Sequence, residues 1–148
     1  MALMEFEYSF YHNDFTTMKN YTDDFSFILK PSTVPNAGVG VFAVHDIRSG
    51  TKLVLNKEGG ESRVLKMDEI PEILQQYTIA LGDGMRKAPQ AFNHMWIVWY
   101  LNHADTPNAE LNQKENDYYA IKDILAGEEI LIDYKVFHEP EGEKDSFY

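Results

Sequence analysis

The sequence contains no cysteine, so disulfide bonds and thiolate metal sites are excluded. The spacing of His94, His103 and His138 matches no metal-binding motif, and we expect no metal site. No stretch approaches the roughly 20 apolar residues of a membrane span. The first residues also lack the basic and apolar regions of a secretory signal. We therefore expect a soluble intracellular protein, cytoplasmic or nuclear, with no membrane partner.

Basic residues are scarce as well. The chain has 13 lysines and arginines against 24 aspartates and glutamates, which gives a formal net charge of −11. Nucleic-acid phosphates would be repelled by this charge, so we expect no direct binding of nucleic acid. The charge suits a basic protein or peptide partner, but it is explained equally well as a means of keeping the protein soluble.

The length of 148 residues suits one compact domain with a substantial core. Aromatic side chains make up 14% of the chain, so this core or a pocket is rich in rings. We divide the chain into an N-terminal extension (1–24), a domain (25–137) and an acidic C-terminal tail (138–148). No internal repeat or linker splits the domain.

Short β-prone segments alternate with turns along most of the domain, which is typical of a mainly β fold. We expect strands at 25–30, 41–44, 51–56 and 62–66, a hairpin formed by 109–113 and 117–122, and a strand at 129–134.

One helix is predicted over residues 67–81. Asp68 can cap it, Pro71 stands in its first turn, and Ile70, Ile73, Leu74 and Tyr77 share one face. Residues 81–89 are predicted to form a loop. The apolar run 94–101 is too short to be assigned from its periodicity.

Two glycines, Gly38 and Gly40, lie one residue apart in the stretch NAGVGVFA (36–43). Glycine allows close approach of the backbone to a ligand, although a tight turn between strands is the simpler explanation of the pair alone. The dinucleotide-binding fingerprint is excluded, because no third glycine and no opening helix follow.

Polar residues follow the most apolar run of the chain directly, in WYLNHADTPN (99–108). The Asn102 amide donates and accepts hydrogen bonds, and the His103 ring adds two nitrogens. This pair can therefore bind the polar edge of a heterocycle or a charged amine. Taken alone, it is explained more simply by a core histidine and a turn at 105–107.

A third segment, AGEEILIDY (126–134), is predicted to be a strand that ends on Asp133 and Tyr134. Active-site groups often lie where a strand ends. An ordinary tyrosine on an edge strand fits the same pattern, and this segment alone does not decide between the two.

Together and in this order, the three segments resemble a SET domain, the family of S-adenosylmethionine-dependent protein lysine methyltransferases. The matching motifs are GVGVF (38–42), YLNH with PN (100–103 and 107–108) and GEEILIDY (127–134). The resemblance covers about residues 25–137. It implies a mainly β fold of small curved sheets with one or two short helices, in which the C-terminal segment is threaded through a loop as a pseudoknot.

The resemblance also implies a role for each motif. The pseudoknot would gather 36–43, 99–108 and 126–137 around S-adenosylmethionine, which is converted to S-adenosylhomocysteine without a metal. Tyr134 matches the catalytic tyrosine of the family. The residues implied in cofactor binding are Ala37, Gly38, Val39, Gly40, Asn102, His103 and Phe137.

Methyl transfer from a sulfonium to an amine is an in-line displacement that needs a neutral lysine amine held in a narrow channel. Burial favours the neutral amine, and aromatic walls suit the lysine stem and its methylated cation. The candidate channel residues are Tyr118, Tyr119 and Trp99, with Trp96 and Phe137 as further wall candidates. For any one of them, ordinary core packing is the simpler explanation.

The sequence departs from the family at several points. Trp99 stands where many members have arginine, and Ala104 replaces a common serine. The stretch TKLVLNKEG (51–59) lacks a tyrosine that often faces the lysine channel. No cysteine cluster follows Tyr134 to form a zinc-bound lid, so Phe137 either supplies the lid or packs as a core anchor.

These observations predict a protein lysine N-methyltransferase that acts on a basic protein such as a histone tail. The alternative is a non-catalytic SET-like module that binds a peptide, which the missing channel tyrosine and the small size favour slightly. Small members without flanking cysteines are sometimes dimers, so the resemblance also allows a homodimer.

Overall fold

The computed structural model describes residues 20–23, 25–55 and 62–137, and its strands are all short. The strands are β1 (Phe27–Pro31), β2 (Val39–Ala43), β3 (Lys52–Leu53), β4 (Ser62–Lys66), β5 (Ile79–Gly82), β6 (Met85–Pro89), β7 (Asn102–His103), β8 (Ala109–Asn112), β9 (Asp117–Ala120) and β10 (Leu131–Ile132). The helical segments are the α-helix α1 (Glu72–Gln75) and the 3-10 turns η1 (Met67–Glu69), η2 (Phe92–His94), η3 (Ile97–Tyr100) and η4 (Tyr134–Phe137).

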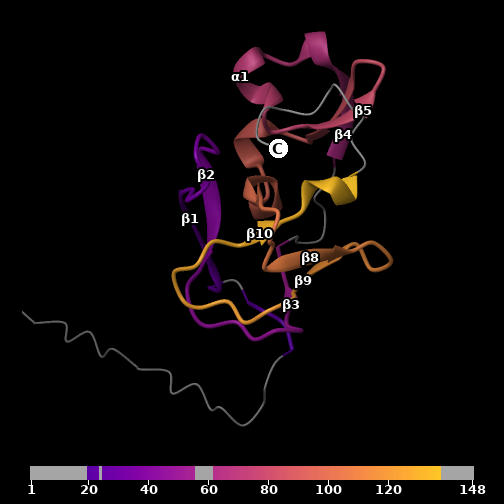
Figure 1. Ribbon diagram of the computed structural model, residues 1–148. Helices are drawn as coiled ribbons and strands as arrows, with labels where there is room; N and C mark the ends of the chain where they lie inside the picture. The colour runs from indigo at the N-terminus through magenta and orange to yellow at the C-terminus, as the bar shows by residue number, and fades with distance from the viewer. Residues whose placement is uncertain (1–19, 24, 56–61, 138–148) are drawn as a thin grey trace, which may run out of the picture.

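The strands form four small sheets (Figure 1). β1 pairs with β2, β4 and β5 flank β6, and β3 and β8 flank β9, all in antiparallel pairs. β7 and β10 form a parallel pair. The predicted mainly β fold of small sheets with short helical segments is confirmed, and threading of the C-terminal segment through a loop stays a prediction.

A single buried cluster connects the sheets other than the one formed by β4, β5 and β6. It includes Val41 of β2, Leu53 of β3, Tyr118 of β9 and Ile132 of β10. Each large apolar side chain that is fully buried stabilises the fold by roughly 1.5–3 kcal/mol. Figure 1 shows β10 at the centre, between the β1–β2 ribbon and β8.

The segment around β10 joins two of these sheets through its backbone. On one side, the Ile130 N–H donates to the carbonyl oxygen of Val41 at 2.7 Å. On the other side, the Ala104 N–H donates to the carbonyl oxygen of Ile132 at 2.9 Å. Strand β2 and the residues after β7 are therefore held by one stretch of chain.

Asn108 fixes the same stretch with its side chain. Its Nδ2 donates to the carbonyl oxygen of Glu129 at 2.7 Å, and its Oδ1 accepts from the Leu131 N–H at 2.8 Å. The Asn108 N–H also donates to the Leu131 carbonyl oxygen at 3.1 Å, so Asn108 binds the backbone on both sides of Ile130. Asn108 of the PN motif thus has a structural role, because it binds the backbone of residues 129–131.

The predicted helix over 67–81 is wrong. The segment is divided into η1, α1 and β5, because Ile70 is extended, with φ −106° and ψ 121°, directly before Pro71. A proline ring disfavours helical dihedral angles in the residue that precedes it. Pro71 therefore precedes α1. Glu69, and not the predicted Asp68, caps η1, because its carboxylate accepts the Lys66 N–H at 2.8 Å.

The predicted loop at 81–89 is also wrong, because these residues complete the hairpin of β5 and β6. Gly82 pairs with Met85 across the two-residue turn Asp83-Gly84. Both turn residues have positive φ, 53° and 70°, as a type I′ turn requires. The Asp-Gly dipeptide is itself a sequence signal for a hairpin, and it is independent of the periodicity of the apolar residues.

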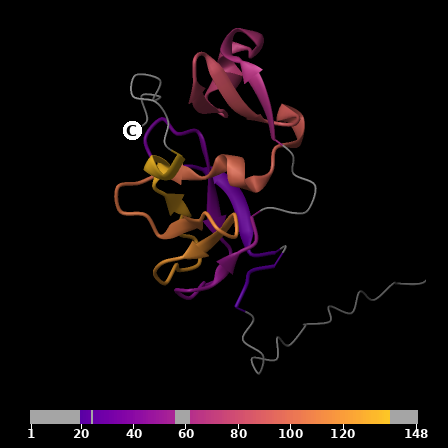
Figure 2. The ribbon, with the colours of Figure 1, turned by 90° about the vertical axis from the view of Figure 1, so that its right-hand side faces the viewer.

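The apolar run 94–101 contains the end of η2 and all of η3, with β7 following directly. The strand predicted at 129–134 is shorter, since only Leu131 and Ile132 pair with β7, and Tyr134 begins η4. The other predicted strands are confirmed: β4 has the predicted bounds, β3 and the 109–122 hairpin are shorter, and β1 and β2 are shifted to 27–31 and 39–43. Figure 2 shows the β4–β6–β5 sheet at the top, joined to the rest through η2 and η3.

The end of the predicted N-terminal extension lies against β3. The Lys52 N–H donates to the Asn20 carbonyl oxygen at 2.8 Å, and the Thr22 N–H donates to the Lys52 carbonyl oxygen at 2.9 Å. Residues 1–19 and the predicted tail (138–148) lie outside the described residues, so the domain boundaries stay predictions. No helix in the described ranges is long and apolar enough to cross a membrane.

Candidate active site

The sequence motifs meet at one buried carboxylate, that of Glu129, which is only 5% exposed. Its Oε1 accepts hydrogen bonds from Ser32 Oγ at 2.7 Å and Asn102 Nδ2 at 2.9 Å. Its Oε2 accepts from the backbone N–H and the hydroxyl of Thr33, at 2.6 and 2.5 Å. The C-terminal motif is thereby bound both to the Asn-His pair and to the loop that leads into β2.

Gly40 leaves room for this carboxylate. A Cβ atom at this position would lie 2.0 Å from Glu129 Oε1 and 3.2 Å from Asn102 Nδ2. Gly38 differs, since its φ is +72° and a Cβ there would meet no atom within 4 Å. The first glycine of GVG therefore serves the turn between β1 and β2, and the second serves close packing of the motifs.

The side chain of Asn102 is occupied within the protein. Besides Glu129, its Nδ2 contacts Ser32 Oγ and the Val39 carbonyl oxygen, each at 3.0 Å. The residue is buried, so these contacts are not exchanged for water. Asn102 thus joins the GVG segment to the C-terminal motif, and a direct contact of its Nδ2 with a ligand would have to displace one of these acceptors.

The Glu129 carboxylate is stabilised in its charged form. Burial raises its pKa, but the hydrogen bonds from Asn102, Thr33 and Ser32 outweigh burial and bring the pKa below its usual value. A buried charge is tolerated only where donors surround it, and four donor groups do so here.

Tyr134, His103 and Phe137 form a partly buried aromatic group beside this network. The ring centroids of Tyr134 lie 5.5 Å from His103 and 5.9 Å from Phe137. The Tyr134 hydroxyl donates to the Leu101 carbonyl oxygen at 2.5 Å, and its backbone N–H donates to His103 Nδ1 at 3.1 Å. Because Nδ1 accepts, the neutral ring carries its proton on Nε2.

Two carboxylates lie next to the His103 ring. Asp105 Oδ1 is 3.7 Å from His103 Nε2 and 3.2 Å from Lys135 Nζ, and Asp133 Oδ1 is 3.7 Å from His103 Nδ1. Asp105 is largely exposed, so its ion pairs contribute little stability. Because Lys135 offsets the charge of Asp105, the two carboxylates leave one excess negative charge beside the ring.

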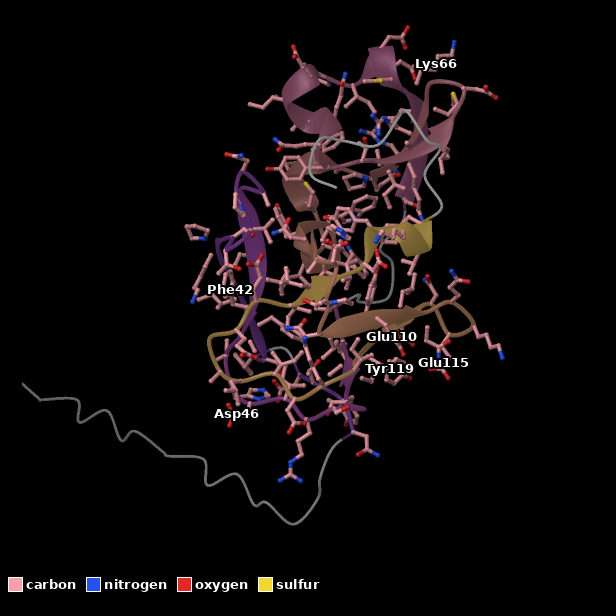
Figure 3. The ribbon with its side chains drawn as sticks, viewed as in Figure 1. Phe42, Asp46, Lys66, Glu110, Glu115 and Tyr119 are labelled. Atoms are coloured by element: carbon pink, nitrogen blue, oxygen red, sulfur yellow. The ribbon has the colours of Figure 1, made fainter. Side chains whose placement is uncertain are left out.

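The predicted channel residues Tyr118 and Tyr119 point to opposite faces of β9, as successive strand residues must. Tyr118 is buried in the same cluster that Tyr134 and Phe137 pack against, and burial raises its pKa to about 12, so its phenol stays neutral. Tyr119 instead donates to the Glu115 carboxylate. Figure 3 shows Tyr119 beside Glu110 and Glu115, across the molecule from Phe42. Tyr118 is therefore part of the cluster that Tyr134 packs against, and Tyr119 is not.

The two tryptophans lie in and directly before η3. Trp99 lies in η3 and Trp96 directly precedes it, and both are half-buried. Their neighbours Ile97, Val98 and Tyr100 pack against the buried cluster. In the described part of the chain, neither tryptophan is among the side chains that pack against this cluster. A channel role for Trp99 therefore stays a prediction.

The chemistry of this group of residues fits S-adenosylmethionine. The half-buried rings offer apolar faces for an adenine. The Leu101 carbonyl oxygen and the Tyr134 phenol oxygen, 2.5 Å apart, offer lone pairs to a cation. The space beside Gly38 leaves backbone accessible to a ligand. Among the described residues, no three histidines, aspartates or glutamates are arranged to hold a metal ion.

A comparison with protein families finds a match for this chain. The model of the SET domain matches residues 38–135 of the chain, which include all three motifs. The chain therefore belongs to the SET domain family. None of the curated proteins matches this chain.

Two solved structures are similar to parts of this chain. A crystal structure of a candidate histone methyltransferase from Plasmodium falciparum is 25% identical, with 74% of this chain and 92% of that chain covered and a TM-score of 0.45. A chain of ctPRC2, in an autoinhibited conformation bound to S-adenosylmethionine, is 23% identical, with 74% and 15% covered and a TM-score of 0.47.

Sequence reasoning missed the residues that bind the motifs together: Ser32, Thr33 and the role of Glu129. One signal was present, because Glu129 opens the apolar stretch ILI and a carboxylate in a buried strand requires donors. Nothing in the sequence pointed to Ser32 and Thr33, which lie almost a hundred residues away.

We predict that Gly40→Ala costs about 2–4 kcal/mol in the free energy of unfolding, because the new methyl group overlaps Glu129. In a Glu129→Ala background the same change costs less than about 1 kcal/mol. Urea unfolding of the four proteins measures this coupling. Gly50→Ala is the control: Gly50 has φ +82° and open space, so its cost of about 1 kcal/mol is equal in both backgrounds. Equal costs for Gly40→Ala would contradict the packing argument.

We also predict a specific pH dependence of stability. Since the pKa of Glu129 is lower in the folded chain, its charge contributes stability above the unfolded value near 4.5, and this contribution is lost as pH falls through the folded pKa. The difference in unfolding free energy between wild type and Glu129→Gln should be constant near neutral pH and shrink below about pH 4.5. A difference that stays constant down to about pH 3 would refute it.

Proposed function

We propose that this protein is a protein lysine N-methyltransferase that uses S-adenosylmethionine and acts on a basic protein such as a histone tail. Membership of the SET domain family supports methyl transfer. The observation that carries the proposal is the Tyr134 hydroxyl, which is fixed on the carbonyl oxygen of Leu101, directly before the Asn-His pair.

The residues near Tyr134 account for the chemistry. When bound, S-adenosylmethionine supplies an electrophilic methyl group on a cationic sulfur. His103, Phe137 and the backbone from Ala37 to Gly40 would hold the cofactor. The Tyr134 hydroxyl donates a hydrogen bond to the carbonyl oxygen of Leu101. The lone pairs of the phenol oxygen are therefore left to accept an N–H of the lysine amine. This orients the nitrogen lone pair toward the methyl group.

The substrate amine must be neutral before it attacks. Burial beside the aromatic group disfavours the charged ammonium, so its proton is released to solvent before the lysine reacts. With cofactor and lysine bound, the adjacent oxygens of Leu101 and Tyr134 would stabilise positive charge at the reacting nitrogen. Tyr134 therefore acts by orienting and by electrostatics, and it need not act as a base.

Charge supports a basic substrate. The chain carries a formal charge of −11, and Asp105 and Asp133 lie beside the His103 ring. An acidic surface raises the rate of encounter with a lysine-rich peptide, and added salt weakens that attraction.

A peptide-binding module without catalysis is the second candidate, and one observation favours it. Strand β3 directs a fully buried Leu53 into the core and pairs Lys52 with Asp117, so neither residue supplies a hydroxyl to a lysine channel. Cofactor binding separates the two functions, since a ligand of the native state raises the unfolding temperature by mass action.

We predict that Tyr134→Phe lowers methyl transfer to a basic protein about 100-fold or more, because the phenol oxygen no longer orients the amine. The thermal shift produced by S-adenosylhomocysteine should be retained, since the ring remains. Tyr21→Phe, which removes a hydroxyl from an exposed tyrosine, is the matched control and should keep full activity. Absence of any thermal shift in the wild type at millimolar cofactor would favour the module instead.

A further inference from the structure

The loop between β1 and β2 (residues 32–38) carries part of the proposed cofactor site, namely Ala37 and Gly38. Within the loop, the Ser32 N–H donates to the Gly38 carbonyl oxygen at 2.9 Å, and the Ala37 N–H donates to Val34 at 3.2 Å. These contacts close the loop on itself. They do not place it relative to the rest of the site.

Its attachment to other segments runs through Glu129 and Asn102. Ser32 Oγ and Thr33, by its amide and its hydroxyl, donate to the Glu129 carboxylate, and Asn102 Nδ2 contacts Ser32 Oγ. In the part of the chain that the structure describes, no other hydrogen bond joins residues 32–38 to a distant segment. The loop is also largely exposed, so apolar packing contributes little to its position.

The chemistry of these contacts requires a carboxylate. Ser32 Oγ accepts from the Val34 N–H at 3.0 Å as well as from Asn102, so its own proton is directed to Glu129. All the groups facing Oε1 and Oε2 are therefore donors. A glutamine of the same size would turn an NH2 group toward some of them, and at least one hydrogen bond would be lost.

Tyr134 is held independently of this carboxylate. Its hydroxyl rests on Leu101, its backbone N–H on His103, and its ring on Phe137. Loosening the loop should therefore weaken cofactor binding without disturbing the group that orients the amine.

We propose that Glu129 is a positioning residue that sets the affinity for S-adenosylmethionine by fastening the β1–β2 loop to Asn102. The inference rests on the proposed function, because it assigns Ala37 and Gly38 to the cofactor site. Glu129 does not touch the reacting atoms. It acts through the loop, and its effect belongs to binding and not to the chemical step.

The test compares Glu129→Gln with Glu128→Gln, the same change at the exposed neighbouring glutamate. In the cofactor-free protein, the Thr33 amide should exchange with solvent at least about tenfold faster in Glu129→Gln, and unchanged in Glu128→Gln. Calorimetry with S-adenosylhomocysteine should show a Kd raised at least about tenfold in Glu129→Gln only. At saturating S-adenosylmethionine, kcat should stay within about threefold of wild type.

Thr33→Ala is the second variant, because it removes one donor from an exposed residue and keeps the fold. It should raise Kd by a smaller factor. If Glu129→Gln binds S-adenosylhomocysteine as wild type does, or lowers kcat with Kd unchanged, the inference is wrong while the proposed function stands. If the wild type binds no cofactor, both are overturned.

Discussion

A buried carboxylate needs donors on every side, and in this protein the donors come from distant parts of the chain. Glu129 takes them from Ser32 and Thr33, before β2, and from Asn102, at the start of β7. Gly40 is the counterpart of this arrangement, since any side chain there would occupy the place of the carboxylate. The GVG segment, the Asn-His pair and the C-terminal motif are thus joined at one point.

The position of Tyr134 depends on a neighbouring attachment that does not use this carboxylate. Asn108 fixes the backbone around β10, and Tyr134, two residues after β10, lies beside His103 and donates its hydroxyl to the carbonyl oxygen of Leu101. Polar residues after an apolar run therefore have two tasks. Asn102 binds motifs together inside the protein, and His103 faces the partly buried aromatic group where a ligand would lie.

The sequence predicts much of the fold and the family, and few of the contacts that hold the motifs together. Short β-prone runs between turns are local signals, so most strands are where the sequence predicts them. The predicted helix is wrong at Pro71. The apolar spacing favours a helix through this residue, but proline keeps Ile70 extended. The Asp83-Gly84 dipeptide is a local hairpin signal too, and it accounts for the paired strands where a loop is predicted. The contacts between Thr33 and Glu129 span too much of the chain to be predicted from spacing. Alternation places Tyr118 and Tyr119 on opposite faces of β9, but which of the two faces the core depends on how β9 pairs and packs.

Acidic composition, family membership and the fixed tyrosine lead to one central claim, that the protein transfers methyl groups to lysine. Incubating it with S-adenosylmethionine and core histones or other basic proteins, followed by peptide mass spectrometry, tests this claim most directly. The account predicts added methyl masses on lysine side chains that depend on the cofactor. Unmodified lysines in all these substrates, from a protein shown to bind S-adenosylhomocysteine, would contradict it.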